Sequence, residues 1–244
     1  MEPHEYALMD AAEGRMWWYR ALHARLTDAL AGVRGCVLDA GCGTGGLLAA
    51  LRPARPDLTL VGLEWSAPAS RRAREKSGAA IARGSVNALP FADASFDAVL
   101  AADVLCHGAV DPAAALAELH RVLRPGGKLV VNMPAYAWLL SAHDRHVHNV
   151  RRWTAAGTGA ALSGAGFARV RARYWNGLLL PLMVLQRRLL ARGDGAASDV
   201  APFSPWLDAT LHAITAIERR LPLPLPAGGS VLATAIRPSS TQAP

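Results

Sequence analysis

The segment Val37–Gly46, with the sequence VLDAGCGTGG, decides the fold that we expect for this chain. A short apolar run ends at Asp39, four glycines follow within six positions, and an Ala/Leu-rich pattern begins after them. This order indicates a buried parallel strand, a tight turn without Cβ atoms, and the exposed N-terminus of a helix. Because free amides at a helix start favour an anionic group, the segment predicts a nucleotide-like cofactor.

The acid in this segment narrows the choice of cofactor. Gly41, Gly43 and Gly46 also satisfy the dinucleotide-binding pattern G-x-G-x-x-G, which alone is a weak signal. Asp39 stands two positions before the first glycine, where a carboxylate repels a pyrophosphate and attracts an amine or a sulfonium. The segment resembles motif I of the class I S-adenosylmethionine (SAM)-dependent methyltransferases.

Further segments extend the resemblance over residues 35–135. Residues 58–63 predict a second strand that ends before Glu64, and an acid about 20 residues beyond the glycines suits the ribose hydroxyls of a cofactor. Residues 84–91, 95–100 and 119–132 are similar to the third, fourth and fifth strand regions of the family, in the same order. The chain therefore resembles the bacterial small-molecule branch of these enzymes.

Alternating strand and helix patterns predict an α/β fold, Rossmann-like and doubly wound, with a mostly parallel seven-stranded sheet and helices on both faces. We expect strands near 35–40, 58–63, 79–83, 96–102, 127–133, 167–175 and 230–237, and helices near 11–31, 44–52, 66–77 and 111–124. The resemblance implies that the last strand is antiparallel. We divide the chain into an N-terminal helical cap (1–34), a SAM-binding core (35–175) with a polar loop (135–153), a helical insertion (176–228), the last strand (229–237) and a tail (238–244).

Composition excludes some classes of protein. Hydrophobic residues make up 52% of the 244 residues and charged residues 18%, which is typical of a globular protein rather than a disordered one. The net charge of +7 comes almost entirely from arginine and is weak evidence for a polyanionic partner. The three cysteines have neither disulfide nor zinc-ligand spacing, so we expect no metal. The first residues show no apolar signal segment, which predicts a cytoplasmic protein.

The resemblance implies a set of cofactor-binding residues. In it, Arg20 reaches the carboxylate of SAM, and Ser85 replaces an aspartate that commonly accepts a bond from the adenine amino group. One of the adjacent tryptophans of the first helix covers the cofactor. The complete set is Trp18, Arg20, Asp39, Ala40, Gly41, Gly43, Glu64, Trp65, Ser85, Val86 and Asp103.

The polar loop follows the fifth predicted strand, and open α/β sheets bind their ligands at such strand ends. We therefore expect His143 or His148 to act as a general base, with Asp144 orienting the ring. His107, after the fourth strand, is another candidate base. Arg151, Arg152 and Tyr136 are assigned to the methyl acceptor, with the arginines clamping a carboxylate or phosphate. The alternative is a solvated loop whose histidines have no catalytic role.

The helical insertion joins an apolar run, residues 178–185, to a basic stretch at 186–190. The run is too short to span a bilayer. A link is expected at 193–198 and a second amphipathic helix at 205–221. The insertion is compatible with a lid over an apolar substrate, a dimer face, contact with a membrane surface, or helices packed on the sheet edge. The protein is expected to be a monomer or a homodimer.

The resemblance implies in-line methyl transfer from SAM, with S-adenosylhomocysteine (SAH) as the product. The acceptor is expected to be a small molecule, a modified peptide or a lipid-like compound, with O-methylation favoured over N-methylation. A nucleic-acid methyltransferase is disfavoured, because the arginine pairs at 187–188 and 219–220 lack interleaved aromatic residues. A SAM-binding protein without turnover stays open, since Ser85 and Cys106 depart from the family pattern.

Overall fold

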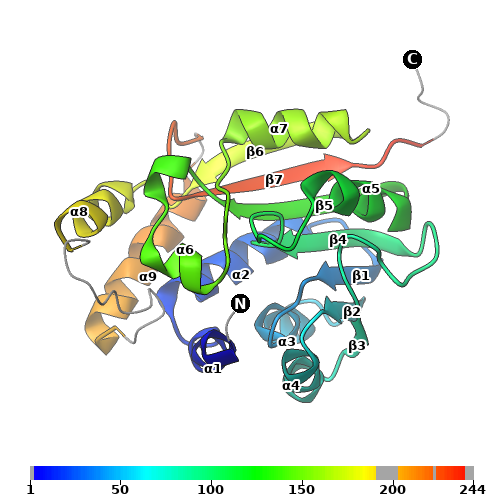
Figure 1. Ribbon diagram of the computed structural model, residues 1–244, viewed down its shortest axis with the longest axis horizontal. Helices are drawn as coiled ribbons and strands as arrows, with labels where there is room; N and C mark the ends of the chain where they lie inside the picture. The colour runs from blue at the N-terminus through cyan, green and yellow to red at the C-terminus, as the bar shows by residue number, and fades with distance from the viewer. Residues whose placement is uncertain (1–2, 191–202, 222–223, 240–244) are drawn as a thin grey trace.

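A seven-stranded sheet with helices on both faces forms the centre of the computed structural model, which describes residues 3–190, 203–221 and 224–239 (Figure 1). The strands lie in the order β3-β2-β1-β4-β5-β7-β6. Their bounds are β1 Gly35–Ala40, β2 Leu58–Glu64, β3 Ala80–Arg83, β4 Phe96–Ala102, β5 Leu123–Pro134, β6 Ala168–Trp175 and β7 Ser230–Ile236. The helices are α1 Pro3–Ala12, α2 Trp17–Ala29, α3 Gly46–Ala54, α4 Ala67–Ser77, α5 Pro112–Val122, η1 Ala137–Leu139, α6 Ala142–His146, α7 Ala155–Gly164, α8 Leu180–Leu190 and α9 Pro205–Arg220.

The sheet is parallel except for β7, which is antiparallel to both β5 and β6. Strand order reverses between β1 and β4, which pair in parallel with Val37 opposite Ala98. Such a reversal leaves a crevice outside the carboxyl ends of the two strands, where open α/β sheets bind ligands. The predicted Rossmann-like fold, including the antiparallel last strand, is confirmed.

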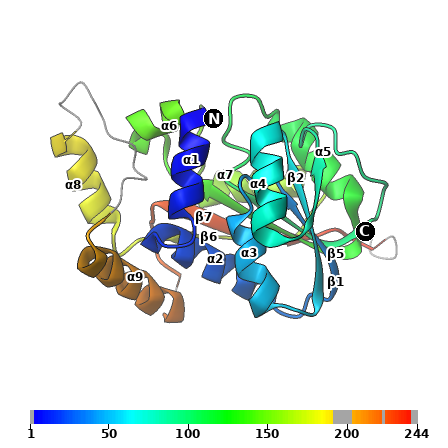
Figure 2. The ribbon, with the colours of Figure 1, turned by 90° about the horizontal axis from the view of Figure 1, so that it is seen from below.

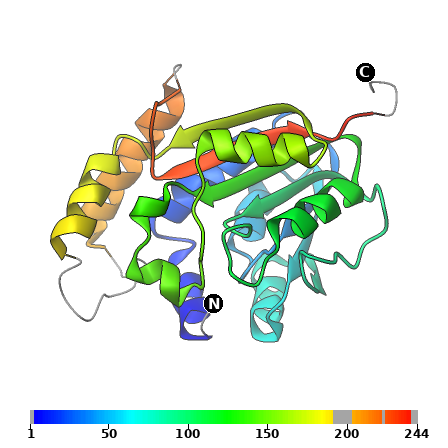
Figure 3. The ribbon, with the colours of Figure 1, turned by 45° about the horizontal axis from the view of Figure 1, so that its top comes forward.

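Neighbouring residues of the central strands point to opposite faces of the sheet and enter separate cores. Leu38 and Val99 pack with α5 and α7, whereas Val37 and Ala98 pack with α2 and α3. This alternation is the two-residue period of a strand that is covered on both sides. Figure 3 shows α5 and α7 together on one face.

The starts of two helices carry the predicted signals. Asp111 accepts the amide of Ala113 at 2.9 Å, with Pro112 as the first residue of α5. Ser66 accepts the amide of Ala69 at the start of α4. Both contacts satisfy amides that the helix itself leaves unpaired.

One expected helix was wrong, and two helices were not predicted. The single leading helix at 11–31 is two helices, α1 and α2, separated by a turn at 13–16 in which Met16 is extended. α6 and α7 were not predicted, because α6 is only five residues long and the sequence of α7, AAGTGAALSG, has no clear polar face. The predicted link at 193–198 and residues 240–244 of the tail lie outside the described residues.

Helix α9 of the insertion packs beside α2. A buried ion pair joins Arg25 of α2 to Glu218 of α9 at 3.1 Å. Leu211 of α9 packs against Trp17 and Leu179. Among the described residues, no helix is long and apolar enough to cross a membrane.

Candidate active site

A cavity of about 1140 Å³ opens at the carboxyl ends of the parallel strands. Its walls include Asp39 near the end of β1, Glu64 at the end of β2 and Asp103 after β4. α1, α2, the polar loop and α8 supply the other walls. Figure 2 shows α1 between α4 and α6. The cavity therefore lies at the point where the strand order reverses.

Glu64 is the centre of a hydrogen-bond network on the β2 side. Its Oε2 accepts the amide of Gly43 at 3.0 Å, and its Oε1 accepts the amide of Ser66 at 2.8 Å. The hydroxyl of Tyr6, from α1, donates to Oε1 at 3.0 Å. Burial, with the charge of Glu64, raises the pKa of the Tyr6 phenol, which therefore stays protonated and a donor. The carboxylate is thus held in one orientation facing the cavity.

Asp39 is 2% exposed, yet no described residue donates a hydrogen bond or an ion pair to its carboxylate. Burial, with the nearby charges of Glu13 and Glu64, raises the pKa of Asp39 to about 7. A buried carboxylate is costly unless a cation or donor accompanies it. The site therefore favours a ligand that brings its own positive charge to Asp39.

The other predicted cofactor residues fall into two groups. Trp18, Gly41, Gly43, Trp65, Ser85 and Val86 line the cavity, whereas Ala40 is fully buried behind the wall and Arg20 lies outside it. Arg20 pairs instead with Asp208 of α9 at 2.5 Å. The expectation that Arg20 reaches the cofactor carboxylate is corrected, because α9 supplies the partner that the sequence did not reveal.

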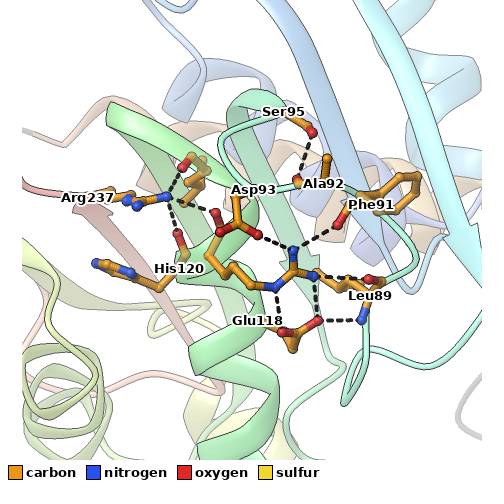
Figure 4. Close-up of polar contacts among 10 residues, drawn as sticks. Leu89, Phe91, Ala92, Asp93, Ser95, Glu118, His120 and Arg237 are labelled. Carbon is orange, nitrogen blue, oxygen red and sulfur yellow. Dashed lines mark hydrogen bonds and ion pairs between the residues drawn. The ribbon is translucent and has the colours of Figure 1, made fainter.

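Hydrogen bonds from α5 hold the segment that follows Ser85 and Val86. Glu118 accepts the amide of Leu89 at 2.6 Å, and Arg121 donates to the carbonyl oxygens of Leu89 and Phe91 (Figure 4). Arg237, just after β7, donates to the carbonyl oxygens of His120 and other residues at the end of the same helix. This network anchors the loop whose residues Ser85 and Val86 line the cavity.

Several cavity residues of α1, α2 and the turn between them were not predicted from the sequence, among them Tyr6, Glu13, Tyr19 and His23. Glu13 accepts the hydroxyl of Thr44 at 2.7 Å and pairs with Lys76, so the turn after α1 rests on the glycine segment. The partners of Tyr6 and Glu13 lie tens of residues away along the chain, and no local pattern signals such contacts.

The histidines of the acceptor side meet at one end of the cavity. His107, His143 and His148 all line it, together with Asp144. The rings of His107 and His148 lie 5.8 Å apart between centroids. Burial, together with the charges of His148 and Arg151, lowers the pKa of His107 to about 4. His107 is therefore neutral at pH 7, and its Nδ1 accepts the amide of Ala109 at 3.2 Å.

The two arginines of the polar loop do not form the predicted anion clamp. Arg152 makes a buried, two-pronged pair with Asp144, with closest contact 2.8 Å. Arg151 lies outside the cavity lining and donates to three main-chain oxygens, of Leu105, His107 and Val110. Both guanidinium groups hold the loop in place. Arg152 also lines the cavity, so the expected contact with the acceptor is corrected for Arg151 alone.

Asp144 and Tyr136 also have structural partners. Besides Arg152, Asp144 accepts the amide and hydroxyl of Ser141 at the start of α6. Tyr136 stacks between Trp138 and Tyr174 and is not part of the cavity wall. The predicted contact of Tyr136 with the acceptor is therefore corrected.

The affinity for a cationic ligand is expected to depend on pH through Asp39. Because its pKa is raised to about 7, the charged form that attracts a cation dominates only above that pH. SAM should bind roughly tenfold more tightly at pH 8 than at pH 6, with proton release on binding near pH 6. The same raised pKa means that this group stabilises the cofactor-free fold below about pH 4 and loses that contribution as pH rises through 7.

Calorimetry of SAM binding across this range, in buffers of different ionisation enthalpy, measures the effect. An Asp39→Asn variant provides the control, since its affinity should be low and nearly independent of pH. An affinity that rises toward acid pH in the unaltered protein would contradict the prediction.

The residues present fit SAM. Asp39 has no cationic partner in the part of the chain that the structure describes, Glu64 offers a fixed carboxylate that suits a ribose, and the glycine segment brings main chain to the cavity wall. No group of three or more metal-ligating side chains is found among the described residues. Fold and site together define a class I methyltransferase architecture with a SAM-type cavity.

Comparison with known proteins finds a family model that matches part of the chain. Residues 38–131 match the family described as "Methyltransferase domain". A SAM-dependent methyltransferase from Thermotoga maritima has the same fold, with a TM-score of 0.61, 19% identity and coverage of 96% of this chain and 95% of that one.

Two curated relatives are similar to about half of the chain. A demethylmenaquinone methyltransferase of Deinococcus radiodurans is 39% identical over 119 residues, which are 47% of this chain and 48% of the relative. A malonyl-[acyl-carrier protein] O-methyltransferase of Herminiimonas arsenicoxydans is 37% identical over 126 residues, 51% of this chain and 46% of the relative. The chain thus spans less than half the length of these relatives.

Proposed function

We propose that this protein is a SAM-dependent methyltransferase that transfers a methyl group to a hydroxyl of a small-molecule, modified-peptide or lipid-like acceptor. The observation that carries the proposal is the buried carboxylate of Asp39, which has no partner among the described residues, beside the fixed carboxylate of Glu64 at the reversal point of the sheet. SAM supplies an electrophilic methyl group when bound, and SAH is the product. N-methylation is the less favoured outcome.

The size and lining of the cavity support a second ligand beside the cofactor. A volume of about 1140 Å³ exceeds the 300–1,000 Å³ that is usual for a site with one ligand. Met16, Trp17, Met183 and Phe203 give the acceptor side an apolar wall from α2, α8 and the residues before α9. The insertion (176–228) is therefore proposed as a lid over an apolar acceptor. The relative of Herminiimonas that is named an O-methyltransferase supports oxygen as the acceptor atom.

The remaining assignments follow from the same proposal. Cys36, Cys42 and Cys106 are free thiols, which suits a reducing cytoplasmic location. The chain's own residues would bind the cofactor, align the acceptor and exclude water, and a base is needed because a hydroxyl arrives protonated. His107, His143 and His148 are the candidates for that base.

Binding and turnover together test the function. Purified protein should bind SAM and SAH in calorimetry and should transfer the labelled methyl group of SAM to a compound in a small-molecule, peptide or lipid pool. Absence of heat with both SAM and SAH would refute the proposal. Transfer to RNA or DNA instead would replace the proposed acceptor class.

The base assignment has its own expected result. Whichever of His107, His143 and His148 is the base, its substitution by alanine should slow methyl transfer by about a hundredfold. This is the low end of general-base effects, and SAH affinity should stay unchanged. His146→Ala is the control, because His146 is exposed and outside the cavity lining. Turnover equal to that of the control in all three variants would remove the histidines from the mechanism.

A further inference from the structure

The end of β4 carries a carboxylate whose two oxygens have different surroundings. Asp103 lines the cavity, and its Oδ1 accepts a hydrogen bond from Nδ2 of Asn132, on β5, at 2.9 Å. Its Oδ2 accepts no hydrogen bond from the described residues. One oxygen is therefore fixed, and the other is available to a group inside the cavity.

A chain of hydrogen bonds sets the orientation of this carboxylate. Trp175, at the end of β6, donates its Nε1–H to Oδ1 of Asn132 at 2.8 Å. Because the amide oxygen of Asn132 receives this bond, its NH₂ group must face Asp103. Asn132 is fully buried, and Trp175 lies below the cation of Arg25, 4.5 Å from the ring centroid. The two residues form a rigid support behind Asp103.

The backbone of Asp103 is held in an uncommon conformation. Its φ is +55°, in the left-handed region, and its amide donates to the carbonyl of Asn132 at 2.8 Å. Aspartate tolerates this region better than most residues, but the conformation still costs energy. The surrounding contacts therefore maintain a strained residue at the cavity wall.

The charged neighbours of Asp103 come from several elements. Burial, with the charge of Asp144, raises its pKa to about 7, while Asn132 and Arg152 act in the opposite direction. Tyr19 of α2 also faces it, and its phenol has a raised pKa for which burial is the main cause. Arg152 is already paired with Asp144. No described cation is therefore dedicated to Asp103.

We propose that Asp103 is a catalytic residue whose Oδ2 faces the point of methyl transfer and stabilises the positive charge that moves onto the acceptor. Asn132 and Trp175 are positioning residues. The inference rests on the proposed function. During transfer the bond from acceptor oxygen to methyl carbon forms and the S–CH₃ bond breaks, with its electron pair left on sulfur. The acceptor O–H bond breaks and its proton passes to the histidine base, so the positive charge leaves sulfur, develops on the acceptor oxygen beside the fixed carboxylate, and ends on the imidazole.

Sinefungin, a SAM analogue with an amino group at the place of the transferred methyl, is a direct probe of this geometry. Its ammonium should pair with Asp103, so the protein should bind sinefungin about tenfold more tightly than SAH at pH 8. The preference should diminish at pH 6, as the carboxylate becomes protonated. In Asp103→Asn the preference should disappear at both pH values, with SAH affinity within twofold of the unaltered protein.

Asp39→Asn is the matched control, because a carboxylate that serves the amino-acid end of the cofactor should affect SAH and sinefungin alike. Asparagine also tolerates a positive φ, so Asp103→Asn should keep the fold. An unchanged preference in Asp103→Asn, or an equal loss of SAH and sinefungin affinity, would overturn the inference. Failure of the unaltered protein to bind either compound would instead refute the proposed function, and the inference with it.

Discussion

Replacing Glu64 by alanine is expected to weaken SAM binding at least a hundredfold while the protein stays folded. The carboxylate is oriented in advance by the amides of Gly43 and Ser66 and by Tyr6, and a ribose would donate to Oε2 and, in place of Tyr6, to Oε1. Charge-assisted hydrogen bonds contribute roughly 1.5–3 kcal/mol each, and the loss of two accounts for about a hundredfold or more. Calorimetry with SAM and circular dichroism of the variant measure affinity and fold separately.

Two control variants sharpen this result. Glu64→Gln keeps one oxygen in place without the charge and should lose affinity by about tenfold. Glu75→Ala removes an exposed carboxylate of the neighbouring helix α4, whose side chain is 67% exposed, and should leave affinity unchanged. SAM binding by Glu64→Ala within threefold of the unaltered protein would show that Glu64 does not hold the cofactor.

The largest effect on stability is expected from Glu218→Ala. Glu218 is buried in α9, pairs with Arg25 at 3.1 Å, and accepts the amides of Asn176, Gly177 and Leu178 at 2.5–3.0 Å. Its removal leaves a buried guanidinium and three amides without their acceptor. Breaking a buried ion pair in this way costs about 3–5 kcal/mol of the free energy of unfolding. Chemical denaturation of the variant measures this loss.

The adjacent residue provides the comparison for this variant. Arg219 pairs with Asp28 at 3.6 Å, and the side chain of Asp28 is 62% exposed. Such surface pairs contribute about 0–1 kcal/mol, so Arg219→Ala should be close to neutral. If both variants lost less than 1 kcal/mol, α9 would not be held to α2 by this buried network.

The sequence allowed prediction of features that local physics dictates. Asp39 and the glycines form one short segment, and Glu64 follows a strand at a recognisable spacing, so the sheet and the cofactor side of the cavity could be predicted. The acceptor side of the cavity could not be predicted, because the charge of a side chain does not reveal which residue it pairs with. Arg20 was assigned to the cofactor, yet its partner Asp208 lies 188 residues further along the chain.

Helix α7 was not predicted from the sequence, for a different reason. Its alanines and glycines show no alternation of polar and apolar positions, although Leu162 and Thr158 are buried. Packing against the sheet, rather than a sequence pattern, selects this helix. Polar density in the loop at 135–153 was read as substrate recognition, whereas much of it stabilises the loop itself.

The adjacent arginines of the polar loop differ in what could replace them. Arg151 directs a single nitrogen, Nη1, at three carbonyl oxygens, and a compact ammonium has three donors for the same task. Arg152 instead grips both oxygens of Asp144 with two nitrogens of one planar group, and a lysine has no second nitrogen to offer. Exchange for lysine is therefore tolerable at the first position and damaging at the second, although the two stand side by side in the chain.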